Sequence, residues 1–126
     1  MYLLDTDVLI DVQRGYAPAA EWLYSLPESP AVPGFVVMEL VQSARNTREV
    51  ERALRFVSRM PVVWPDRESC ARALTIFSTL HLSQSLGLLD SLIATTAIEI
   101  GAELCTFNVK HFRSVPGLVT VQPYVK

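Results

Sequence analysis

The first ten residues, Met1-Tyr2-Leu3-Leu4-Asp5-Thr6-Asp7-Val8-Leu9-Ile10, contain an apolar run that stops at an acid. The run from Tyr2 to Leu4 is typical of a buried strand, and Val8 begins an apolar pattern typical of a helix. Ligands of α/β proteins bind outside the carboxyl ends of the strands, so we expect Asp5 at a binding edge. Asp7 is suited to cap the helix. If both acids are more than turn and cap residues, a divalent cation would offset the cost of desolvating Asp5.

Length and composition restrict the class of protein. A chain of 126 residues, half of them hydrophobic, predicts a single folded domain over residues 1–126. The formal net charge of −2 disfavours a strongly basic binding module, so any polyanion must be held by local basic patches or through metal ions. Cys70 and Cys105 form neither a metal pattern nor a disulfide framework, and we expect both to be buried. The chain shows no signal segment and no membrane-spanning run, which predicts a cytoplasmic protein without membrane contact.

Strand-like and helix-like segments alternate along the chain. Apolar runs typical of strands lie at residues 2–4, 31–33, 61–64, 102–106 and 119–121. Helical patterns lie between them, at about residues 8–13, 19–26, 34–41, 47–60, 66–80 and 88–100. This order predicts an α/β fold with three layers, α/β/α, and about five parallel strands flanked by helices. The residues expected to face inward from the helices at 47–60 and 66–80 are Val50, Leu54, Val57, Cys70, Ala73, Leu74 and Phe77.

Glu39 is the single carboxylate in the apolar helix predicted at residues 34–41. It could lie on an exposed face, or pair with Arg45 or Arg48. The mixed side chains one turn away favour a cleft edge, and polar groups are seldom buried without a partner. The helix at 47–60 carries several arginines, which we interpret as a solvated face, although Arg52, Arg55 and Arg59 share one side and form a modest basic patch.

Asp90 and Asn108 complete a set of oxygen ligands. Asp90 falls in the first turn of the helix at 88–100, where alone it would only complement the helix dipole. Asn108 follows the strand at 102–106, so it is expected at the same sheet edge as Asp5. Three carboxylates and an amide suit Mg²⁺ or Mn²⁺, and zinc is disfavoured because no His or Cys accompanies them. Such a site can activate water and neutralise charge on a phosphodiester.

Four segments of the chain resemble the signature blocks of the PIN-domain family, and more narrowly of VapC-type toxins. The segments are Leu4-Asp5-Thr6, Met38-Glu39-Leu40, Leu89-Asp90-Ser91-Leu92-Ile93-Ala94 and Cys105-Thr106-Phe107-Asn108-Val109-Lys110-His111-Phe112. The resemblance runs nearly end to end. It implies a Mg²⁺- or Mn²⁺-dependent endoribonuclease, the toxin of a toxin–antitoxin system, with an RNA substrate, a cognate antitoxin and a homodimeric state.

The resemblance also implies roles for individual residues. Asp5, Glu39 and Asp90 correspond to metal-binding catalytic acids, and Asn108 corresponds to a fourth catalytic and metal-binding position that is Asp in many members. Thr6 and Thr106 match small polar positions that support the site, whereas Asp7 departs from the usual Ser or Asn. His81 and His111 are left out of the catalytic set, because metal-activated water needs no histidine base.

Two other classes of function share part of the pattern. Asp5-Thr6-Asp7-Val8 also resembles the first motif of haloacid-dehalogenase-like phosphatases, but the chain has no adjacent Asp/Glu pair for their downstream motif. A response-regulator receiver would need an acceptor Asp on its middle strand, and no Asp occurs between Asp11 and Asp66. A PIN-fold protein that binds RNA without cutting it is the remaining alternative. The presence of all three acids argues against it.

Overall fold

A parallel sheet runs through the centre of the molecule in the computed structural model, which describes all 126 residues. In one part β1 (Tyr2–Leu4) pairs with β4 (Glu103–Cys105), which pairs with β5 (Thr120–Val121). In the other part β2 (Val32–Pro33) pairs with β3 (Val62–Val63). A parallel bridge between Leu3 and Ala31 joins the two parts. The strand order is therefore β3-β2-β1-β4-β5, which confirms the predicted parallel sheet with shorter strands than expected.

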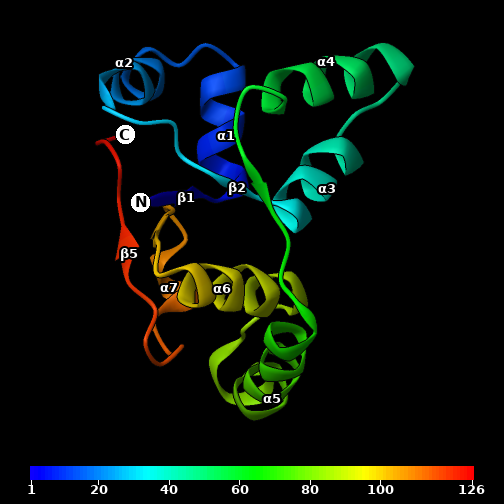
Figure 1. Cartoon of the computed structure of the whole chain (residues 1–126), viewed down its shortest axis with the longest axis vertical. Helices are drawn as coiled ribbons and strands as arrows, with labels where there is room; N and C mark the ends of the chain where they lie inside the picture. Colours follow the sequence, from blue (N-terminus) through cyan, green and yellow to red (C-terminus); the bar gives the residue numbers. More distant parts are fainter.

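Seven helices flank the strands (Figure 1). The helices α1 to α4 lie in the upper half of Figure 1 and α5 to α7 in the lower half, with the strands between them. Their bounds are α1 Thr6–Gln13, α2 Ala17–Ser25, α3 Gly34–Gln42, α4 Thr47–Val57, α5 Arg67–Gln84, α6 Leu88–Ile100 and α7 Val109–Phe112. The class of fold is the predicted one, and the short α7 is an addition to it.

Polar caps set the ends of several helices. Asp5, not Asp7, is the N-cap of α1, because its side chain accepts a hydrogen bond from the Thr6 N–H and the helix begins at Thr6, earlier than predicted. Asn46 and Asp66 cap α4 and α5 by accepting from backbone N–H groups three residues on. Gly101 ends α6 at a φ of +67°, a conformation that glycine adopts without steric cost.

The apolar core lies between the sheet and the helices. Leu3, Leu4 and Leu104 are fully buried on the central strands, and α6 presses its small residues Ala94 and Ala97 toward them. Small residues permit this close approach of helix and sheet.

Some of the predicted inward residues are wrong. Leu54 and Leu74 are 48% and 66% exposed, and Cys70 is also exposed, whereas Cys105 is buried as predicted. Val57 of α4 and Ala73 of α5 are buried as predicted. They are joined inward by Ala53 on α4 and by Ser69 on α5, which packs on α6. Each buried pair has i, i+4 spacing, so each helix packs through one stripe of its surface, as predicted. The stripe is rotated about the helix axis relative to the predicted one and contains smaller side chains. None of the helices combines the length and apolarity needed to cross a membrane.

Gly34, the first residue of α3, provides a test of this packing. A Cβ placed there would collide with the Trp64 ring, which also stacks edge-on against Phe35 with centroids 5.7 Å apart. We expect Gly34→Ala to lower the free energy of unfolding by about 1–3 kcal/mol, the usual cost of overpacking. In a Trp64→Ala background the same change should cost much less, and urea melts of all four proteins measure the coupling. An equal cost in both backgrounds would show that the ring does not constrain this position.

Candidate active site

Asp5 lies at the point where β1 ends and α1 begins. The residue is only 5% exposed. One carboxylate oxygen accepts from the Thr6 N–H and the other from the Thr106 hydroxyl, both at 2.8 Å. Thr106 follows β4, so this carboxylate joins the carboxyl ends of two neighbouring strands. The structure therefore confirms that Asp5 lies at the predicted edge of the sheet.

The Thr6 side chain connects Asp5 with the helix α3. The Thr6 hydroxyl donates a 2.8 Å hydrogen bond to Glu39, which is partly buried in the middle of α3. Neither arginine considered as a partner pairs with Glu39: Arg45 forms its ion pair with Glu49, at 3.1 Å, and Arg48 forms none. Thr6 therefore orients both carboxylates, that of Asp5 through its N–H and that of Glu39 through its hydroxyl.

Asp7 holds the loop that follows β4. Its carboxylate accepts from the Val8 N–H and from the Phe107 N–H, each at 2.8 Å. The neighbouring Asn108 N–H donates to the Thr106 hydroxyl at 3.0 Å, while the Asn108 residue is exposed and its side chain makes no capping bond. The amide of Asn108 is thus free to face a ligand. The sequence does not predict the Asp7–Phe107 contact, because nothing local links residues 100 positions apart.

Asp90 stands in the first turn of α6, with a different set of contacts. Its carboxylate accepts from the Gly87 N–H at 3.0 Å and lies 3.6 Å from the His111 Nδ1 on α7. A Cβ at position 87 would collide with this carboxylate, so a glycine there leaves room for the Asp90 side chain. His111, although not predicted as a site residue, is therefore the basic partner of a predicted site acid, Asp90. His81 instead stacks on Phe77, at 4.8 Å between ring centroids.

The hydrogen bonds divide the predicted residues into two groups. One network contains Asp5, Glu39 and the two threonines, with Asn108 attached through its backbone. Asp90 is linked to His111 and Gly87 and shares no hydrogen bond with that network. As the side chains stand, no three His, Cys, Asp or Glu residues are arranged to hold a metal ion. A metal site shared by Asp5, Glu39, Asp90 and Asn108 remains a prediction.

The electrostatics of the first group fit a hard cation. Burial, followed by the charge of Asp7 and more weakly that of Glu39, raises the pKa of Asp5 to about 7, against the hydrogen bonds from Thr106 and Thr6. Burial also raises the pKa of Asp7. Asp5, Asp7 and Glu39 form no ion pair with Lys, Arg or His. Their oxygens are the ligands that Mg²⁺ and Mn²⁺ take, and a bound cation would offset the charge that burial leaves uncompensated.

The PIN-domain family model matches residues 2–118 of this chain. The chain belongs to the PIN-domain family. It is 36% identical over 124 residues to Ribonuclease VapC19 of Mycobacterium tuberculosis, covering 94% of this chain and 97% of that protein. It also resembles, at 27% identity, a TM-score of 0.80 and full coverage of both chains, a chain in the structure of a toxin–antitoxin complex from Klebsiella pneumoniae.

A second solved structure is VapBC2 from Rickettsia felis bound to a DNA fragment from its promoter. One of its chains matches at a TM-score of 0.77 and 25% identity, over 95% of this chain and 96% of that chain. The predicted resemblance to VapC-type members of the PIN-domain family is therefore confirmed.

The raised pKa of Asp5 predicts how stability depends on pH without metal. Below about pH 4 Asp5 is protonated in both the folded and unfolded states. As pH rises from there through about 7, the unfolded chain loses its proton first, so the folded state loses stability. The free energy of unfolding of Asp5→Asn minus that of wild type should rise by roughly 2–4 kcal/mol between about pH 4 and pH 8.

Urea melts in EDTA measure this difference, and Asp11→Asn is a matched control on the same helix. Burial raises the pKa of the Asp11 carboxyl, but hydrogen bonds from Tyr124 and Lys126 outweigh it, so the pKa is lowered overall. Its contribution is therefore complete above the unfolded pKa and should be constant from about pH 5 to pH 8. A difference for Asp5→Asn that does not change with pH would mean that Asp5 is not destabilised by its charge.

Proposed function

We propose that this protein is a Mg²⁺- or Mn²⁺-dependent endoribonuclease and the toxin of a toxin–antitoxin pair. The observation that carries the proposal is the buried Asp5 carboxylate, linked through Thr6 to Glu39 at a sheet edge without any paired cation. The confirmed kinship with a protein named as a VapC ribonuclease supports the same reaction. The substrate would be RNA, cut by hydrolysis of its phosphodiester bonds.

Four residues of the chain are proposed to hold the cation that this reaction needs. Asp5, Glu39, Asp90 and Asn108 would hold the cation, and their oxygens are its preferred ligands. When bound, the cation supplies charge neutralisation at the scissile phosphate and lowers the pKa of water.

Two threonines and one acid would act by positioning. Thr106 and Thr6 each donate to one carboxylate, Asp5 and Glu39 respectively, which fixes the direction of the remaining lone pairs. Asp7 accepts a hydrogen bond from the Phe107 N–H and would thereby fix the backbone position of the next residue, Asn108.

The two groups of residues would come together when the cation binds. Asp90 and the Asp5–Glu39 network share no hydrogen bond, so nothing in either network has to break for them to share an ion. The Oδ2 atom of Asp90 carries both the Gly87 hydrogen bond and the 3.6 Å contact with His111, so Oδ1 would be the oxygen that holds the cation. His111 then stands beside the site as a positioning group for Asp90.

The proposed partners follow from the same charge. Asp5 and Glu39 have no paired cation, which suits the site to inhibition by a basic side chain. We expect a cognate antitoxin to insert one, most simply an arginine, among Asp5, Glu39 and Asp90. We also expect a homodimer that acts in the cytoplasm. The alternatives of a phosphatase and of a non-cutting RNA-binding protein are decided by the cleavage experiment below.

Substitution of the acids tests the proposed role of each. Asp5→Asn, Glu39→Gln and Asp90→Asn should each lower Mn²⁺-dependent RNA cleavage by about a hundredfold or more, because removing a ligand exceeds the roughly 10–100-fold cost of changing a supporting residue. The three losses should not add, since the groups act as a unit.

The control for these substitutions is Glu68→Gln, which removes an exposed acid of α5 that forms no ion pair. It should cut RNA at the wild-type rate. Gel assays with EDTA and with Mn²⁺, together with circular dichroism, separate activity from folding. A folded Asp90→Asn protein that cuts RNA at the wild-type rate would remove Asp90 from the site. Wild type that binds RNA but never cuts it would establish the non-cutting alternative.

Asn108 offers a test by gain of affinity. Its side chain is exposed and makes no capping bond, so Asn108→Asp adds a charged ligand without breaking a cap of α7. Mn²⁺ binding, measured by calorimetry on the metal-free proteins, should tighten by roughly tenfold, the effect of a gain of about 1.4 kcal/mol. Equal affinities for the wild type and the Asn108→Asp protein would show that this position lies outside the coordination sphere.

A further inference from the structure

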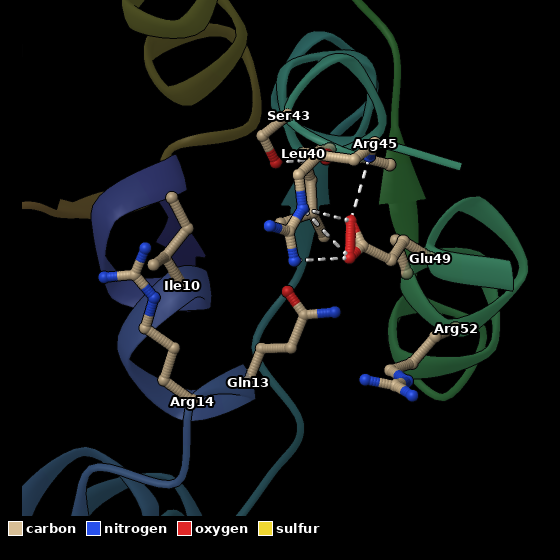
Figure 2. A pocket seen from close by; sticks show the side chains of 10 residues that line it. Ile10, Gln13, Arg14, Leu40, Ser43, Arg45, Glu49 and Arg52 are labelled. Carbon is tan, nitrogen blue, oxygen red and sulfur yellow. Dashed lines mark hydrogen bonds and ion pairs between the residues drawn. The ribbon is translucent and has the colours of Figure 1, made fainter. Parts of the chain in front are cut away.

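A cavity of about 570 Å³ opens between α1, α3 and α4 (Figure 2). In Figure 2, Ile10 and Gln13 come from α1, Arg14 from its C-cap, and Leu40 and Ser43 from α3 and its C-cap. Glu49 and Arg52 come from α4, and Arg45 from the loop before it. None of these residues belongs to the proposed catalytic set.

The charge of this lining is positive although the whole chain carries a net charge of −2. The lining contains three guanidinium groups, those of Arg14, Arg45 and Arg52, and a single carboxylate, that of Glu49. Only Arg45 is neutralised, by its hydrogen-bonded ion pair with Glu49 at 3.1 Å. Arg14 and Arg52 form no ion pair and are exposed. Neither guanidinium is held in an ion pair, so both are available to an anion.

The cavity is continuous with the acidic site along two helices. On α1, Ile10 and Gln13 follow Thr6 at i+4 and i+7, so the three residues form one line on the helix surface. On α3, Ser43 follows Glu39 at i+4 and lines the cavity. Because Thr6 and Glu39 are hydrogen-bonded to each other, both lines start at the same point. The axial rise from Thr6 to Gln13 is about 10 Å, within reach of a strand a few nucleotides long.

We propose that this cavity is a second binding site for the RNA substrate, in which Arg14 and Arg52 hold backbone phosphates a few nucleotides from the cut. This inference rests on the proposed ribonuclease function. The guanidinium fork matches the geometry of phosphate oxygens. The lining has no aromatic side chain on which a base stacks, so the site reads the backbone and not the sequence. It orients the strand so that its neighbouring phosphate enters the acidic site.

RNA binding as a function of salt tests the proposal. The probe is a fluorescent single-stranded RNA of about 12 nucleotides, mixed in sequence, with EDTA present to prevent cutting. The double variant Arg14→Ala/Arg52→Ala should bind roughly tenfold more weakly. Its slope of log affinity against log salt should become shallower by about 1.4, at about 0.7 for each phosphate that an arginine no longer holds. Both side chains are exposed, so the fold is expected to survive, and circular dichroism checks it.

The matched control is Arg59→Ala/Arg67→Ala, which removes the same charge from two exposed residues outside the cavity. Its affinity and slope should stay close to those of wild type. Equal effects of the two double variants would show that only net charge matters and would overturn the proposal. A poly-glutamate peptide that binds through Arg14 and Arg52 while RNA does not would assign the surface to an acidic protein partner, which also overturns it.

Cleavage of total RNA with Mn²⁺ separates this inference from the proposed function. If wild type cuts RNA but neither binding nor cutting depends on Arg14 and Arg52, the ribonuclease stands and the second site falls. If RNA binding depends on the two arginines but no cutting occurs under any metal condition, the phosphate site stands and the ribonuclease proposal falls.

Discussion

The structure depends on how one buried carboxylate, that of Asp5, is held between two strands and a helix. Its oxygens accept from the Thr6 N–H and the Thr106 hydroxyl, so the same group starts α1 and joins the ends of β1 and β4. Burial also makes its negative charge costly, and its pKa rises to about 7. The geometry that positions this acid therefore lowers the stability of the metal-free protein at neutral pH, a tension typical of functional sites.

Hydroxyl and backbone N–H groups, not cations, organise the acids around Asp5. Thr106 donates to Asp5 and accepts from the Asn108 N–H, Thr6 donates to Glu39, and Asp7 accepts from the Phe107 N–H. A neutral donor orients a carboxylate without cancelling its charge, unlike an arginine or lysine. Negative charge at the sheet edge and positive charge in the cavity beside α4 thus coexist in a chain of small net charge. Such a separation suits a polyanion that is held at one place and cut at another.

Some features were readable from the sequence because their signals are local. The alternation of apolar strands and helices predicted the parallel sheet, and the positions of Asp5, Glu39, Asp90 and Asn108 along it indicated a candidate site. Rotation of the outer helices was not readable. Leu54 and Leu74 look like core residues by type, yet Ala53 and Ser69 face inward in addition to the predicted Val57 and Ala73, because small residues let α4 and α5 pack closely on their neighbours. An apolar residue on an exposed face carries no penalty strong enough to mark it in a sequence.

The sequence by itself determined which oxygen-bearing side chains are the candidates and the sheet edge at which Asp5 lies, since both follow from residue type and from the order of strands and helices. The tertiary structure decided the contacts between distant segments: Thr106 with Asp5, Phe107 with Asp7, and His111 with Asp90. It also formed the cavity lined by Arg14, Arg45 and Arg52, which lies between α1, α3 and α4. These features depend on side-chain directions across packed helices and strands, which residue spacing along one element does not specify.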